Sequence, residues 1–274
     1  MKVDMEKVTF SYSRDAFVLK DIDLVLDEPG LTCIIGPNGV GKSTLVKCIN
    51  KLLIPTSGSI FLDETDVKSL NFKMLSKKIG FVPATTSDSF SMSVIDTVLM
   101  GRTPHKHLGS ENEDLHIVYN ILEDMNLTHL ALRNNNELSA GQHQRVSIAR
   151  GLAQEPDLLI LDEPTANLDI RHQVMVIELL KKVAHENKIT VLMISHDLNI
   201  TAKYADKVIV MSTPGVIHSV GTPREVMNED MIRYVYGMNS KILDMDGHLH
   251  IILGSAVSDD EMILLHRNEC DYGN

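Results

Sequence analysis

Two kinds of hydrophobic pattern divide the chain. Residues 7–12 (KVTFSY) and 21–26 (DIDLVL) alternate apolar and polar side chains, which is typical of half-buried strands. From about residue 92 to 153, apolar positions recur at helical spacing without a convincing strand between them. The sequence therefore predicts an N-terminal antiparallel β subdomain and a separate, inserted α-helical subdomain.

Short continuous apolar runs supply a third pattern. Residues 30–35 (GLTCII), 157–161 (DLLIL) and 189–194 (ITVLMI) favour strands buried on both faces. Helical patterns at 42–52 and 170–186 alternate with them, which indicates an α/β core with a mostly parallel sheet. The last segment, 241–274, contains a predicted strand pair and a short helix but no motif that we can interpret.

Composition narrows the function classes. The 274 residues include 37 acidic and 26 basic side chains, for a formal net charge of −11. No Lys/Arg-rich block stands out, so we expect no nucleic-acid partner bound through its phosphates. We expect neither a membrane-spanning helix, which needs about 18 apolar residues, nor a signal peptide. Three widely spaced cysteines fit a reducing cytosol.

A glycine-rich segment carries the strongest chemical signal. Residues 36–44 (GPNGVGKST) match the pattern G-x-x-x-x-G-K-[ST] between a predicted strand and a predicted helix, a context that a chance glycine-rich turn lacks. Backbone N–H groups and the helix N-terminus can surround phosphates there, Lys42 adds charge, and Ser43 offers a hydroxyl to Mg²⁺. This predicts a P-loop NTPase core with ATP and Mg²⁺ as cofactors. The expected nucleotide-binding residues are Gly36, Pro37, Asn38, Gly39, Val40, Gly41, Lys42, Ser43 and Thr44.

Polar residues follow two of the predicted buried strands. Asp162 can hold Mg²⁺ directly or through water, and Glu163 can polarise the attacking water. An ordinary acidic strand end is the alternative, which the upstream phosphate loop disfavours. His196 ends the next strand, at the edge where open α/β sheets bind ligands, and we expect it to face the γ-phosphate. A purely structural histidine is the alternative there.

Residues 138–142 (LSAGQ) resemble the LSGGQ signature of ATP-binding subunits of ATP-binding cassette (ABC) transporters. The resemblance extends over about residues 3–235. It implies that two copies pair, each ATP lying between one copy's phosphate loop and the other's signature, and that hydrolysis drives membrane partners. Ser139 and Gln142 also fit a helix capping box, and both interpretations can hold.

The resemblance assigns further nucleotide contacts. Ser139 and Gly141 would contact the γ-phosphate bound by the second copy, whereas Ala140 replaces the usual first glycine at a helical position that tolerates alanine. Tyr12 stands where the family stacks an aromatic ring on adenine, with simple packing as the alternative. Asp169 ends a segment that crosses the dimer interface. These additional residues are Tyr12, Ser139, Ala140, Gly141, Gln142 and Asp169.

Residues 94–109, which include the element GRTPH (Gly101–His105), resemble importers of ferric siderophores, haem and cobalamin, as do residues 215–237. That branch implies transmembrane permease subunits, an extracytoplasmic substrate-binding protein as an indirect partner, and a cytoplasmic position at the inner face of the membrane. The substrate would not touch this subunit, so its identity is open. The spacing His248-x-His250 does not favour a metal site, because an exposed strand face explains it.

Two other function classes compete with the importer. A soluble ABC ATPase such as an iron–sulfur assembly component stays open, although it does not explain the GRTPH element. A non-hydrolytic regulatory module is disfavoured by Asp162, Glu163 and His196. We expect one ABC ATPase domain over residues 1–240 and an extension, 241–274, that is either regulatory or dimer-stabilising.

One position departs from the family pattern. The resemblance places a glutamine that senses Mg²⁺ and the attacking water after Pro83, where this chain has Ala84. Alanine cannot ligate Mg²⁺ or orient water, and the hydroxyls of residues 85–87 (TTS) would place their oxygens differently. We expect an active ATPase whose link between the γ-phosphate and this loop is weakened or rewired.

Overall fold

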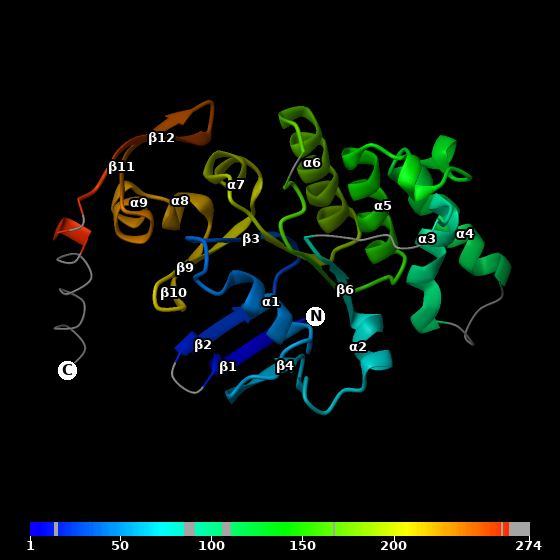
Figure 1. Cartoon of the computed structure of the whole chain (residues 1–274), viewed down its shortest axis with the longest axis horizontal. Coiled ribbons are helices and arrows are strands. Elements are labelled where there is room, and N and C mark those ends of the chain that lie inside the picture. Colours follow the sequence, from blue (N-terminus) through cyan, green and yellow to red (C-terminus); the bar gives the residue numbers. More distant parts are fainter. Residues whose placement is uncertain (14–15, 85–90, 106–110, 167, 259, 263–274) are drawn as a thin grey trace.

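A six-stranded sheet lies at the centre of the computed structural model, which describes residues 1–13, 16–84, 91–105, 111–166, 168–258 and 260–262 (Figure 1). In spatial order its strands are β10 (Val216–Gly221), β9 (Lys207–Ser212), β3 (Gly30–Ile35), β8 (Thr190–Ile194), β7 (Leu158–Leu161) and β6 (Ile79–Val82). All neighbours pair in parallel except β9 and β10. The predicted α/β fold with a mostly parallel sheet is confirmed.

Burial on both faces explains why these strands are continuously apolar. Every residue of β3, β7 and β8 is buried. Along β3, Leu31, Cys33 and Ile35 enter one hydrophobic cluster and Ile34 enters the other, because successive side chains point to opposite faces. Cys33 is 1% exposed and is a core residue, and its burial raises the pKa of the thiol to about 12.

The N-terminal β region is a second, antiparallel sheet. Its strands, in spatial order, are β2 (Ala16–Leu26), β1 (Val3–Ser13), β4 (Ser57–Leu62) and β5 (Thr65–Asp66). Val8, Leu24 and Ile60 of this sheet share a core with Leu45 of α1 (Lys42–Ile49). The sheet therefore lies against the helix that follows the phosphate loop (Figure 1).

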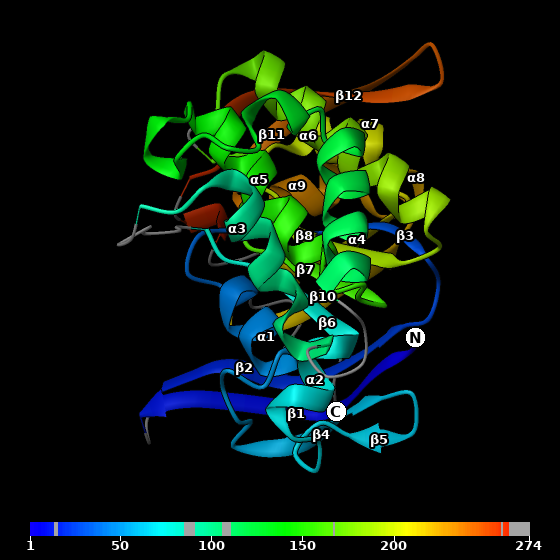
Figure 2. The same ribbon diagram turned by 90° about the vertical axis from the view of Figure 1, so that its right-hand side faces the viewer.

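The middle of the chain is helical. It contains α3 (Val94–Leu99), the 3-10 helix η1 (Met100–His105), α4 (Glu111–Asp124), the short η2 (Thr128–Leu130) and η3 (Asn135–Glu137), and α5 (Ala140–Leu152). These elements gather beside the central sheet (Figures 1 and 2). Among the described residues between 91 and 153 there is no strand. One further helix, α2 (Phe72–Lys78), leads directly into β6.

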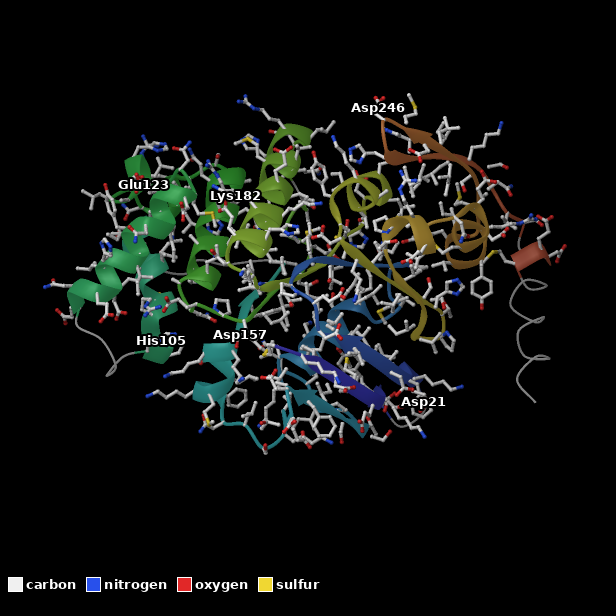
Figure 3. The ribbon with its side chains drawn as sticks, turned by 180° about the vertical axis from the view of Figure 1, so that it is seen from behind. Asp21, His105, Glu123, Asp157, Lys182 and Asp246 are labelled. Atoms are coloured by element: carbon white, nitrogen blue, oxygen red, sulfur yellow. The ribbon has the colours of Figure 1, made fainter. Side chains whose placement is uncertain are left out.

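The C-terminal third surrounds the remaining side of the sheet. Its helices are α6 (Ile170–Glu186), α7 (Leu198–Tyr204), α8 (Pro223–Val226) and α9 (Glu229–Tyr236), and the strands β11 (Met238–Met245) and β12 (His248–Ala256) form the predicted hairpin. Asn199 on α7 holds the hairpin, since its amide exchanges two hydrogen bonds with the backbone of Ile251. Asp246 lies at the hairpin tip, opposite Asp21 in Figure 3.

Residue 240, where we expected the main domain to end, falls within β11. The division into an ATPase domain and an extension therefore stays a prediction, as does the role of the extension. Within the part of the chain that the structure describes, no helix combines the length and apolarity needed to cross a bilayer.

Candidate nucleotide-binding site

Backbone geometry explains the glycines of the phosphate loop. Gly36 has φ 148° and Gly41 has φ 105°, conformations that L side chains rarely adopt. A Cβ atom on Gly36 would lie 2.3 Å from the carbonyl oxygen of Met211, and one on Gly41 would lie 2.7 Å from that of Val18. Only glycine fits at either end of this turn, which leads from β3 into α1.

Lys42 is a buried cation at the start of α1, with 5% of its surface exposed. Its Nζ atom donates to the carbonyl oxygens of Gly36 and Pro37, both at 2.8 Å. Burial lowers the pKa of Lys42, whereas the nearby carboxylates of Glu163 and Asp162 act in the opposite direction. The loop therefore holds the ammonium group in place beside two acids.

Ser43 and Asp162 meet across the loop and the end of β7. The Ser43 hydroxyl donates to Oδ1 of Asp162 at 3.0 Å, and Asp162 is 7% exposed. Burial raises the pKa of Asp162, and the hydrogen bond from Ser43 partly opposes that effect. The two side chains offer oxygen atoms at one place, which is the chemistry that Mg²⁺ selects.

Glu163 and His196 also lie together, as the parallel pairing of β7 with β8 predicts. His196 Nε2 is 2.7 Å from Oε1 of Glu163. Glu163 has φ 52°, a left-handed conformation that is uncommon for a residue with a side chain and that is often found at functional sites. The strand ends thus bring a carboxylate and an imidazole into hydrogen-bonding contact.

One pocket brings six of the nine predicted phosphate-loop residues together with Tyr12, Glu163 and His196. Its described lining residues are Tyr12, Val18, Asn38, Gly39, Gly41, Lys42, Ser43, Thr44, Glu163 and His196. Tyr12 is 65% exposed, and its hydroxyl lies 3.4 Å from Oγ1 of Thr44, so its ring stands at the pocket rim. Gly36, Pro37 and Asp162 adjoin the pocket through the hydrogen bonds described above, and Val40 is buried in the core beneath it.

The predicted signature residues lie outside that pocket. Ser139 caps α5 through the predicted capping box, in which Gln142 N–H donates to Ser139 Oγ and Ser139 N–H donates to Gln142 Oε1. Ser139 and Ala140 are exposed, and Gly141 is buried. Asp169 caps α6 and accepts from the N–H of His172. Within one copy of the chain, the signature residues and Asp169 therefore do not line the pocket of the phosphate loop.

Sequence reasoning missed a contact from the C-terminal region. The backbone of Gly36 lies close to the hydroxyl of Tyr236, at the end of α9, and burial raises the pKa of that hydroxyl. Two hundred residues separate the partners, and no local pattern signals such a contact. The same is true of Val18, an ordinary strand residue that lines the pocket.

The structure gives the GRTPH element a mechanical role. A Cβ on Gly101 would lie 2.3 Å from the carbonyl oxygen of Arg150, so η1 crosses the end of α5 closely. The side chain of Arg102 is 6% exposed and bonds Asp114 Oδ1 at 2.8 Å, Glu155 Oε2 at 2.6 Å and the carbonyl of Ala153 at 2.8 Å. Arg102 thus joins α4 to the C-terminal end of the helix that begins with the signature.

Replacing Arg102 by methionine should cost about 3–5 kcal/mol of unfolding free energy, because the half-buried Asp114 loses its charged partner. Urea unfolding followed by circular dichroism measures the loss. Adding Asp114→Asn should recover part of it. Arg133→Met, at an exposed position, is the matched control. An equal loss of unfolding free energy in that variant would show that the loss does not come from the contacts of Arg102.

Comparisons with known proteins agree with this geometry. The model of the ABC transporter family matches residues 19–166, more than half of the chain. An uncharacterized ABC transporter ATP-binding protein of Methanocaldococcus jannaschii is 40% identical over 247 residues, which are 90% of this chain and 96% of the relative. The ferric enterobactin transport ATP-binding protein of Escherichia coli is 34% identical over 241 residues, which are 87% of this chain and 88% of the relative.

Solved structures extend the comparison to the fold. A chain from an inward-facing structure assigned to the metal-chelate type of ABC transporter is 28% identical, with a TM-score of 0.79 over 92% of this chain and 97% of the other. An ATP-binding cassette solved as a dimer with ADP and Pi is 29% identical, with a TM-score of 0.69 over 81% of this chain and 99% of the other.

This chain belongs to the ABC transporter family, as an ATP-binding subunit that hydrolyses ATP. The resemblance based on residues 138–142 and the phosphate loop is confirmed. The family's cassettes form dimers and work with permease subunits, as the related structures illustrate.

Proposed function

We propose that this chain powers the import of a metal chelate of the ferric siderophore, haem or cobalamin class. One observation carries the ATPase part of the proposal: Lys42, Ser43, Glu163 and His196 line a single pocket. The import part is supported by the names of the relatives, which include a ferric enterobactin transport protein and a transporter of the metal-chelate type. The GRTPH element and residues 215–237 favour the same branch.

Within the pocket, we assign Lys42 and the loop N–H groups to the β- and γ-phosphates and Tyr12 to the adenine ring. Ser43 and Asp162 would hold Mg²⁺, which would offset the burial of the Asp162 carboxylate and draw charge from the phosphates. Glu163 would accept a proton from the attacking water. His196, hydrogen-bonded to Glu163, would orient that carboxylate and face the γ-phosphate.

Two copies would be needed for a complete site. The cap of α5 (Ser139 to Gln142) presents N–H groups at a helix N-terminus, which is suited to bind phosphate, yet it lies outside the pocket of its own chain. Pairing through a two-fold axis would place the α5 cap and Asp169 of each copy on the nucleotide of the other. The related cassette whose structure was solved as a dimer supports this arrangement.

A groove between α2 and η1 is the surface that we assign to the permease. Its lining includes Leu52, Phe72, Phe81, Thr103 and Pro104. Phe72 is 65% exposed, and an apolar side chain so placed fits a partner better than water. β6, which carries Phe81, leads directly to Ala84, so the groove adjoins the loop that departs from the family pattern. Residues 85–87, whose hydroxyls are the alternative ligands, lie outside the described residues.

Co-purification with the membrane proteins encoded by neighbouring genes tests the import assignment. We expect ATPase activity in proteoliposomes to rise when the cognate binding protein and one ferric siderophore, haem or cobalamin are added together. Neighbouring cluster-assembly genes, without a permease or binding protein, would instead favour the soluble iron–sulfur alternative. Localisation at the inner face of the membrane depends on the association of this chain with a permease. If that association is not found, the proposed localisation is wrong too.

Replacing Ala84 by glutamine should lower the Mg²⁺ concentration that gives half-maximal ATPase activity, because glutamine supplies an oxygen ligand that alanine lacks. We expect a shift of about two- to tenfold, the size of one added polar contact. A Mg²⁺ titration at saturating ATP measures it, with Ala84→Leu as the control for bulk. If neither Mg²⁺ dependence nor permease-stimulated turnover changes, the missing glutamine has no consequence here.

A further inference from the structure

The N-terminal ends of α5 and α6 meet at Gly141 and His172. A Cβ atom on Gly141 would lie 2.8 Å from Cδ2 and 3.1 Å from Cγ of the His172 ring. The imidazole therefore packs on the backbone of the signature, and a methyl group on Gly141 would force the His172 ring to move. Gly141 is helical, so the restriction on a side chain there comes from this contact and not from an unusual backbone conformation.

The same ring is tied to the cap of α6. His172 Nδ1 lies 2.7 Å from Oδ2 of Asp169, while Asp169 Oδ1 accepts from the His172 N–H at 3.0 Å. Because an ionised carboxylate only accepts hydrogen bonds, Nδ1 carries the proton. These two bonds hold the pKa of Asp169 below its ordinary value, with the backbone bond as the larger cause.

Gln173, the next residue, holds the segment that precedes α6. Gln173 Nε2 donates to the carbonyl of Leu168 at 2.9 Å and to that of Thr165 at 3.4 Å. The first turn of α6 thus holds the segment before it (Thr165, Leu168 and Asp169) and, through His172, the signature as well. Both segments are the ones that we assign to the partner's nucleotide.

We propose that His172 is a positioning residue that joins the signature and the Asp169 segment into one unit. The inference rests on the proposed pairing of two copies, since both segments act across the interface. It is consistent with an asymmetry in the LSAGQ sequence: Ala140 is exposed, whereas Gly141 is buried and faces the imidazole.

ATP-dependent dimerisation of full-length Glu163→Gln protein tests the link. Gly141→Ala in that background should raise the ATP concentration for half-maximal dimer about tenfold or more, as expected of an overpacked contact. His172→Ala should raise it about three- to tenfold, because one tethering hydrogen bond is lost. Combining the two should be no worse than His172→Ala alone, since the methyl group then has room. Light scattering coupled to size-exclusion chromatography measures dimer formation.

Two further measurements separate positioning from general destabilisation. Binding of a fluorescent ATP analogue to the monomer should be unchanged by His172→Ala, because His172 does not line the phosphate-loop pocket. His172→Asn keeps a donor for Asp169 and should restore most of the dimerisation. His116→Ala, on an exposed position of α4, is the matched histidine control and should behave as the reference.

Three outcomes would overturn the proposal. Gly141→Ala could be equally damaging with and without His172, which would show that its glycine serves only nucleotide access. His172→Ala could leave dimerisation unchanged, which would show that the tether does not matter. If the Glu163→Gln reference itself does not dimerise with ATP, the proposed pairing of two copies is wrong. The role of His172 then fails as well, and the error lies in the proposed function.

Discussion

Glu163→Gln should reduce ATP turnover by on the order of 10²–10⁴-fold, the usual contribution of a general base. Glutamine has the same size as glutamate, so the left-handed backbone at this position and the contact with His196 can persist. Its amide, however, cannot take a proton from water. ATP binding should survive, and the ATP-bound dimer should accumulate because hydrolysis no longer opens it.

Phosphate release at saturating MgATP measures turnover, and size-exclusion chromatography with ATP measures the trapped dimer. Glu186→Gln, at the exposed end of α6, is the matched control and should hydrolyse ATP normally. Normal hydrolysis by Glu163→Gln would refute Glu163 as the base. An inactive variant that neither binds ATP nor dimerises would point to a lost nucleotide site instead.

Much of the fold was predictable because local pattern and final environment coincide. Residues 170–186 have helical spacing and form α6 over that span, and the continuous apolar run at 157–161 becomes a strand buried on both faces. The order in which the strands pair in the central sheet, in contrast, could not be predicted from the sequence. β3 lies between β8 and β9, which are more than 150 residues distant, and no pattern within a window of the sequence specifies that register.

The candidate site likewise combines local motifs, which the sequence predicts, with tertiary contacts, which it does not predict. The phosphate-loop turn and the Ser139 cap are local motifs, and the structure contains both. The packing of His172 on Gly141 and the proximity of Gly36 to Tyr236 are tertiary contacts between segments whose local sequences do not predict that they meet. The sequence predicts a branch of the family from the GRTPH element, but the contacts of its Arg102 with Asp114 and with the carbonyl of Ala153 at the end of α5 could be seen only in the structure.

Lys42→Ala should weaken ATP binding by about 2–5 kcal/mol, which corresponds to roughly 30-fold or more in Kd. Of the described side chains that line the pocket, Lys42 is the only lysine or arginine. Its removal leaves the phosphates facing Glu163 and the buried Asp162 without that compensation. The loop also loses the two hydrogen bonds that Lys42 makes to the carbonyls of Gly36 and Pro37.

Calorimetric titration with MgATP measures the loss, and Lys42→Met separates charge from volume, since methionine fills the space of the lysine stem. Both variants should bind MgATP weakly if the charge of Lys42 dominates. Lys42→Met should bind MgATP more tightly than Lys42→Ala if packing of the lysine stem against the loop also contributes. Lys47→Met, on the same helix but outside the pocket, is the control. A folded Lys42→Ala protein with unchanged Kd would contradict the assignment of this loop to the phosphates, because no other described side chain of the pocket could replace a permanent charge there.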